Sequence, residues 1–191
     1  MFKYECCGEE ESFVEKISKV KARLSNARVA VEDAKYVEQL IFSDYIRTIK
    51  SHKTTWDYRI PTIKAAQEEI GKTKKKKRAN LSYVESAVKE DFFGELNFDI
   101  KIHEIMQGGY EGYYWNLSFN VKDAEYTIQI PSRSELTLDN VKYAHEGRFV
   151  FLKRTSSCCT TVLFEDWTEA DLAVKIKEYF NNENTTSTVE M

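Results

Sequence analysis

The first half of the chain carries apolar residues at the alternating three- and four-residue spacing of a helical seam. Its members are Phe13, Ile17, Val20, Leu24, Ala27, Val31 and Ala34. This spacing is typical of a coiled coil, in which one apolar stripe of a helix faces a partner helix. The seam lapses at Glu38 and resumes at Ile41 and Tyr45. Because no Gly or Pro interrupts residues 9–60, the pattern predicts one helix over residues 13–49, on the order of 55 Å long.

A second helix is predicted after a connection over residues 51–60. Pro61 suits the first position of a helix, where a missing N–H group costs nothing. Apolar residues then recur at Ile63, Ala66, Ile70, Leu81, Val84, Val88 and Phe92. An antiparallel fold about the connection would place Lys74 opposite Glu38 and pair the two polar seam positions. Residues 1–93 are therefore predicted to form an antiparallel, coiled-coil-like helical hairpin arm.

Several apolar residues of the first helix lie off the seam and exceed what a two-helix hairpin needs to bury. They are Val29, Tyr36, Val37, Leu40 and Phe42. An apolar surface of this kind is covered either by the rest of the chain or by a second chain. The sequence therefore allows a homodimer through the helical arm.

The second half of the chain alternates apolar and polar residues with the period of a β-strand. Residues 97–106, 114–121 and 124–130 predict three strands, and residues 148–154 and 158–165 predict two more. The short turns between most of them indicate antiparallel hairpins. The longer connection over residues 131–147 has room for a short helix around residues 138–144.

A final helix is predicted over residues 169–180. Thr168 is a suitable N-cap, with Asp171 three residues on. The apolar stripe of this helix would cover one face of the sheet, while the polar residues 182–191 form a disordered tail. The fold class is therefore α+β: the helical hairpin, followed in residues 94–181 by a mostly antiparallel five-stranded sheet and a covering C-terminal helix.

Charge is distributed unevenly along the chain, whose net charge is −3. Residues 1–93 carry 19 Lys and Arg against 15 Asp and Glu, whereas residues 94–191 carry 9 against 16. The positive charge concentrates between residues 47 and 78, and its densest part is the run of Lys72, Lys74, Lys75, Lys76, Lys77 and Arg78. Such a run binds nucleic acid or another polyanion by releasing counterions. The alternative is a solvated helix face, partly paired with the acidic residues of the first helix.

An aromatic segment accompanies three of the seven glycines, in the sequence QGGYEGYYWN. Exposed tyrosines beside flexible glycines offer a large contact area at a low cost in side-chain entropy. Tyr110, Tyr113 and Tyr114 are therefore candidate contacts for a protein partner. The alternative is that Trp115 and one tyrosine belong to the core, because aromatic residues favour strands in any case.

The sequence contains no recognisable catalytic or metal-binding motif. Its four cysteines form two adjacent pairs, Cys6–Cys7 and Cys158–Cys159, a spacing that serves a tetrahedral zinc ion poorly. His52, His103 and His145 match no catalytic pattern. We expect no enzymatic activity, no metal and no cofactor. The absence of a secretory signal pattern and of a run of about 18 apolar residues favours a cytoplasmic protein without membrane contact.

These features favour a non-catalytic protein-binding module, such as an adaptor, inhibitor or regulator of a larger assembly. The helical arm and the aromatic loop would contact a larger protein or a protein–nucleic-acid complex. The alternative is a nucleic-acid-associated protein that binds phosphates through residues 47–78, for example as a regulator of a nucleic-acid enzyme.

Overall fold

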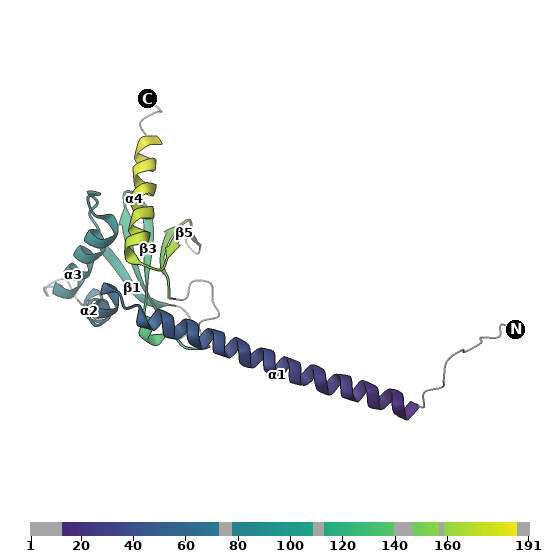
Figure 1. Ribbon diagram of the computed structural model, residues 1–191. Coiled ribbons are helices and arrows are strands. Elements are labelled where there is room, and N and C mark those ends of the chain that lie inside the picture. Colours follow the sequence, from purple (N-terminus) through teal and green to yellow (C-terminus); the bar gives the residue numbers. More distant parts are fainter. Residues whose placement is uncertain (1–12, 73–77, 109–112, 140–146, 157–158, 187–191) are drawn as a thin grey trace. The chain divides into compact units, whose positions relative to one another are not determined.

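The chain is an α+β protein in which helices α1 (Phe13–Ser51), α2 (Thr55–Ile70) and α3 (Ala79–Val88) precede a five-stranded antiparallel sheet and a C-terminal helix, α4 (Glu169–Thr186) (Figure 1). The computed structural model describes residues 13–72, 78–108, 113–139, 147–156 and 159–186. The chain divides into two compact units, Met1–Asp44 and Tyr45–Met191. The predicted α+β class is confirmed: N-terminal helices precede a five-stranded antiparallel sheet and a C-terminal helix that packs on it. The apolar residues predicted to form the second helix of the hairpin belong instead to the core shared with the sheet, while the α1 seam is exposed.

The long N-terminal helix is α1, Phe13–Ser51, close to its predicted range. The prediction that the next helix begins at Pro61 is wrong, because α2 spans Thr55–Ile70 and Pro61 lies inside it. Asp57 Oδ2 accepts a hydrogen bond from the Thr54 backbone N–H at 2.7 Å and so caps the helix at its true start. Burial of Trp56 and Ile60 on the face of Ile63 stabilises the turns that precede the proline.

Helix α3, Ala79–Val88, follows α2 and continues into a short π-helical segment, η1, Lys89–Phe93. The carboxylate of Glu69, near the end of α2, accepts hydrogen bonds from Leu81 N at 3.1 Å and Asn80 Nδ2 at 2.7 Å. Glu69 therefore caps α3 from a neighbouring helix. The predicted pairing of Lys74 with Glu38 lies outside the described residues, since Lys74 does.

The sheet has the strand order β1-β2-β3-β4-β5, and every neighbouring pair is antiparallel. The strands are β1 Ile102–Gly108, β2 Tyr114–Val121, β3 Ala124–Pro131, β4 Phe149–Arg154 and β5 Thr160–Asp166. A 3₁₀ turn, η3, Arg133–Glu135, follows β3. Most of the predicted helix at residues 138–144 lies outside the described residues.

The first strand begins later than its alternating pattern predicts. Phe98 and Ile100 precede β1, yet both pack inward: the Phe98 ring lies 4.9 Å from the ring of Phe180, and Ile100 is buried. Pairing with β2 starts only at Ile102, whose N–H donates to Glu85 Oε1. Alternation before Ile102 therefore reflects packing against helices rather than a strand ladder.

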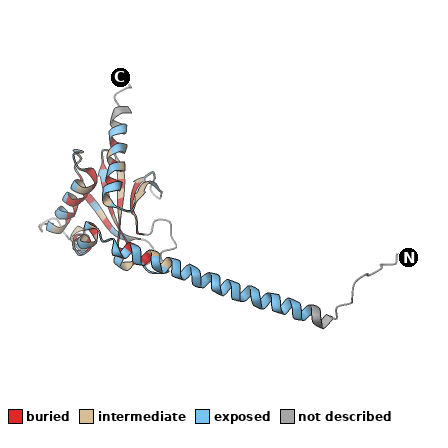
Figure 2. Ribbon diagram, in the orientation of Figure 1, coloured by how far each residue is buried: buried red, intermediate tan, exposed pale blue. Residues whose placement is uncertain are grey.

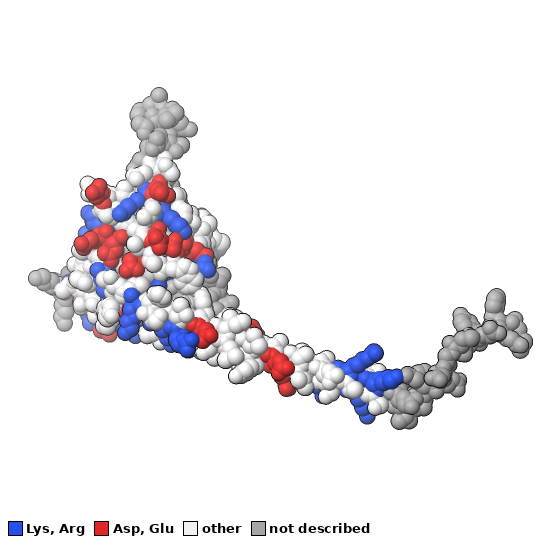
Figure 3. Space-filling model, viewed as in Figure 1, with Lys and Arg blue, Asp and Glu red and all other residues white. Residues whose placement is uncertain are grey.

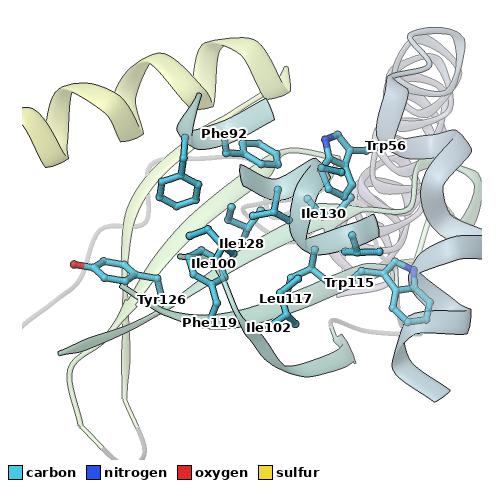
Figure 4. Packing of buried hydrophobic residues seen from close by; sticks show 14 of the residues in the cluster. Trp56, Phe92, Ile100, Ile102, Trp115, Leu117, Phe119, Tyr126, Ile128 and Ile130 are labelled. Atoms are coloured by element: carbon cyan, nitrogen blue, oxygen red, sulfur yellow. The ribbon is translucent and has the colours of Figure 1, made fainter. Parts of the chain in front are cut away.

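The helices of the second unit pack on one face of the sheet and form a single hydrophobic core with it. Trp56 of α2, Phe92 and Phe93 of η1 and Phe180 of α4 share this core with inward residues of the central strands. Figure 4 shows Trp56 and Phe92 together with Leu117, Phe119 and Ile128 of the strands. The Phe93 ring is central, lying 5.6 Å from Phe119 and 5.8 Å from Phe180. Burial of large aromatic side chains of this kind is the dominant stabilising contribution in a unit of this size.

Helix α4, Glu169–Thr186, covers β4 and β5. Its predicted N-cap is confirmed, because Thr168 Oγ1 accepts a hydrogen bond from Asp171 N at 3.1 Å. Leu172, Ile176 and Phe180 form its buried stripe. The helix continues beyond its predicted end at residue 180, and residues 187–191 of the expected tail lie outside the described residues.

Candidate protein-interaction surface

The seam of α1 is exposed along all of its described length in the first unit. The exposed fractions are Ile17 39%, Val20 63%, Leu24 53%, Val31 53% and Ile41 63%. Figure 2 shows this part of α1 as an almost uninterrupted exposed surface. The spacing of three and four residues places these side chains on one face of the helix. The first unit therefore presents an apolar stripe without burying it.

The apolar residues off the seam are exposed as well. Val29, Tyr36, Val37 and Leu40 have exposed fractions between 49% and 63%, and only Phe42 is partly buried. Glu38 replaces an apolar residue within the seam. The exposed apolar surface of α1 is therefore broadest around Glu38, in the part of the first unit that is nearest in sequence to Tyr45.

The last two turns of α1 belong to the second unit and are anchored in it. Ile46 and Ile49 are buried, and the Tyr45 ring meets the Trp167 ring edge-on at a centroid distance of 5.8 Å. Gly147 adopts φ +70°, and a Cβ atom there would lie 3.0 Å from Ile49 Cγ2. Glycine is needed at this position both for its backbone conformation and for the close approach of the helix.

A buried arginine fixes the end of α1 to the start of α4. The guanidinium of Arg133 donates from Nη1 to the carbonyl oxygen of His52 and from Nη2 to that of Trp167. Only 5% of this residue is exposed. Burial lowers the pKa of Arg133, and the nearby charges of Asp57 and Glu169 oppose that shift. The cation lies beside the C-terminus of α1, where the helix dipole favours positive charge.

A cavity of about 410 Å³ lies at this junction. Its lining residues are Tyr45, Thr48, Ile49, His52, Arg133, Trp167 and Thr168. The charged group in this lining is Arg133, and both of its terminal nitrogens already bind backbone carbonyls. The cavity is therefore a mainly apolar recess in which the buried cation is already bound by backbone carbonyls.

The basic run is described only at its two ends. Lys72 Nζ lies 3.8 Å from Glu68 Oε2 on the exposed surface, and Arg78 Nη2 donates to the carbonyl oxygen of Lys72 at 3.1 Å. Lys74, Lys75, Lys76 and Lys77 lie outside the described residues. Elsewhere in the basic window, Arg59 pairs with Asp91 and Lys64 with Glu135. Part of the positive charge of residues 47–78 is therefore neutralised by carboxylates of the same chain.

The tyrosines predicted as an adhesive loop are not exposed where the structure describes them. Tyr113 and Tyr114 are only 3% and 4% exposed, and Trp115 is 2% exposed. The rings of Tyr113 and Tyr114 lie 4.5 Å apart, and Tyr110 lies outside the described residues. Burial at the start of β2 therefore favours the core interpretation of Tyr113 and Tyr114, because a buried ring cannot contact a partner without rearrangement.

The open face of the sheet carries a shallow concavity of about 250 Å³ with polar walls. Two pairs of its side chains interact: Ser118 Oγ lies 3.0 Å from Thr127 Oγ1, and Glu125 accepts from Arg154 Nη1. His103 is exposed, as predicted, and its Nε2 lies 3.3 Å from Glu125 Oε1. Among the described residues, no cluster of His, Cys, Asp and Glu is arranged to hold a metal ion.

The cysteines give little further chemistry in the described part of the chain. Cys159 is exposed, whereas Cys6, Cys7 and Cys158 lie outside the described residues. No described helix combines the length and apolar character needed to cross a bilayer.

Sequence reasoning missed the junction formed by Arg133 and Trp167. An arginine that follows Pro131 and Ser132 reads as an ordinary turn residue. Only the fold shows that its guanidinium meets the carbonyls of two distant segments. The exposed α1 stripe, by contrast, follows directly from the seam spacing.

Comparison of the chain with protein-family models, with curated proteins and with solved structures finds no match.

Proposed function

We propose that this chain is a non-catalytic protein-binding module that engages its partner through α1. The observation that carries this proposal is the exposed seam from Ile17 to Ile41, in which every described apolar residue is solvent-accessible. A stripe of this length is expensive to leave in water and is typical of a helix that pairs with another helix. The second unit, which has its own aromatic core, would serve as the folded domain to which the exposed part of α1 is joined.

The proposal is tested by charges placed within the seam of the full chain. Leu24→Glu and Val31→Glu should each weaken partner binding by at least about tenfold, because a carboxylate would enter an apolar interface unpaired. Asn26→Glu and Gln39→Glu add the same charge off the seam and are the matched controls. Proteins captured from the native host by the wild-type chain are compared quantitatively with those captured by each variant.

A supporting result is a partner retained by both controls and lost with both seam variants. Partners captured equally by the wild-type chain, both seam variants and both controls would contradict binding through α1. Circular dichroism of the second unit's thermal transition checks that the variants keep their fold, since neither seam residue lies in the core.

Nucleic-acid binding through residues 47–78 stays the alternative prediction. Arg47, Lys50 and Lys53 are exposed, but several other basic residues of the window are paired with carboxylates, as described above. A salt-sensitive complex with a mixed-sequence oligonucleotide, lost when Lys74, Lys75, Lys76 and Lys77 are changed to Gln, would favour this alternative.

A further inference from the structure

Between residues 21 and 37, the positions that flank the α1 seam carry only positive charges. One flank consists of Lys21, Arg28, Lys35 and Phe42, and the other of Arg23, Ala30, Val37 and Asp44. The four basic residues of these flanks are all exposed. Glu32 and Asp33 lie away from the seam, so from residue 21 to residue 37 the flanks contain no acidic residue. Figure 3 shows blue side chains gathered on the N-terminal part of the described helix.

Flanking residues decide which helices can pair along a seam. In a parallel pair, a residue of one flank meets the residue of the opposite flank five positions further on in the partner helix. Two copies of this chain would therefore bring Arg23 of each against Arg28 of the other. The same arrangement would stack the two Glu38 carboxylates in one seam layer, where burial makes their repulsion costly.

An antiparallel pair of copies meets the same difficulty. In that orientation each flank faces the same flank of the other copy. Lys21, Arg28 and Lys35 would then face one another, because all three lie on one flank. Both orientations of a homodimer therefore bring like charges together: Arg23 against Arg28 in the parallel pair, and the flank of Lys21, Arg28 and Lys35 against itself in the antiparallel pair.

We infer that α1 pairs with a different helix, one that carries acidic residues at its flanking positions and a basic residue opposite Glu38. This inference rests on the proposed function and specifies the chemistry of the partner. The apolar seam supplies the attraction, while the basic flanks and Glu38 select the partner and its register. Single polar seam residues and flanking charges have these roles in helix pairs.

The chain itself provides a probe for this partner. A synthetic helix of residues 13–48 receives the substitutions Lys21→Glu, Arg23→Glu, Arg28→Glu, Lys35→Glu and Glu38→Lys. Its seam is otherwise native. The reversed flanking residues oppose those of the chain in either orientation, and the lysine introduced at position 38 shares a seam layer with Glu38 of the chain when the two helices are parallel. The matched control is the same helix with the native sequence. Both are titrated against the full chain, whose own mass is measured by sedimentation equilibrium.

The expected result is a monomeric chain that binds the charge-reversed helix at least about tenfold more tightly than the native helix. The difference should shrink as the ionic strength rises from about 0.05 M to about 0.5 M, because exposed flanking charges are screened. Leu24→Glu in the chain should abolish binding of the charge-reversed helix, whereas Asn26→Glu should not.

Other outcomes overturn the inference in distinguishable ways. Self-association that Leu24→Glu abolishes, or equal binding of both helices, would refute a complementary partner and leave α1 as an interaction helix. A monomer that binds neither helix would refute the proposed function as well. Oligonucleotide binding that survives Leu24→Glu but is lost with Arg23→Glu and Arg28→Glu would assign the basic flanks to phosphates instead.

Discussion

Arg133 joins segments that lie far apart in sequence. Its two terminal nitrogens bind the carbonyls of His52 and Trp167, and its guanidinium carbon lies 5.9 Å from the centre of the Phe149 ring. The His52 carbonyl follows α1, and Trp167 precedes the N-cap of α4. A single side chain thereby satisfies backbone groups that secondary structure leaves unpaired.

Replacement of Arg133 tests this role. Arg133→Met should lower the free energy of unfolding by about 2–4 kcal/mol, because two part-buried carbonyls would lose their charged donor while the volume stays similar. Arg154→Met is the control, since the ion pair of Arg154 with Glu125 is partly exposed and should contribute less than about 1 kcal/mol. Urea unfolding measures both, and equal losses in the two variants would contradict a special role for Arg133.

Glu69 is the carboxylate with the clearest link between pH and structure. Hydrogen bonds from Leu81 N and from Asn80 lower the pKa of Glu69 below its ordinary value of 4.5, with a smaller contribution from the charge of Lys72. Partial desolvation opposes this shift. The ionised form is therefore favoured in the folded state, where it caps the N-terminus of α3.

The lowered pKa of Glu69 determines the direction in which the stability of the fold changes with pH. The stabilisation from Glu69 is present above pH 4.5 and is lost as the pH falls through the lowered pKa. Glu69→Gln should therefore be less stable than the wild type at pH 7, and the difference should narrow towards pH 3. Urea midpoints at several pH values measure it, with Glu68→Gln as the control. A constant difference across this range would contradict the capping role of the charge.

At the scale of elements, the strand predictions succeeded where alternation coincided with hairpin pairing. In β2 and β3 every inward residue faces the same core, so the period of two in the sequence is also the period of the ladder. Residues 97–101 alternate for another reason, because Phe98 and Ile100 pack against helices before pairing begins. Periodicity reports burial and does not distinguish these two causes.

The start of α2 shows that a proline can be given too much weight in predicting where a helix begins. Proline favours the first turn of a helix, and Pro61 therefore predicts a start at residue 61. The Thr54–Asp57 cap and the spacing of Trp56, Ile60 and Ile63 were also present in the sequence and define the actual helix. Proline is tolerated inside it because buried side chains stabilise the turns on both sides.

The interaction surface was predictable in part. The apolar stripe of α1 follows from the three- and four-residue spacing of its apolar residues. The same spacing identifies which charged residues lie beside the stripe. Tyr113 and Tyr114 were harder to place, since a tyrosine beside glycines suits both an exposed loop and the start of a buried strand. Their burial depends on packing within the folded sheet, which local sequence does not encode.

The whole molecule combines two units that are stabilised differently. The second unit buries a large aromatic cluster between helices and sheet. Residues 17–44 of α1 bury almost nothing and depend on their own backbone hydrogen bonds. A helix without packing on a partner is only marginally stable in water, whatever its propensity. Residues 17–44, called the arm below, should therefore gain order when their seam is covered by a partner.

Hydrogen exchange tests this difference in stability across the intact chain. In the free protein, amides between Val20 and Leu40 should exchange orders of magnitude faster than those of β2 and β3, because opening the arm exposes no core. The charge-reversed helix should slow exchange in the arm and leave the sheet unchanged, since binding stabilises only the segment it contacts. Adding the native helix is the control. Arm amides as protected as those of β3 in the free monomer would show that α1 is already covered, and would refute the view that its exposed seam awaits a partner.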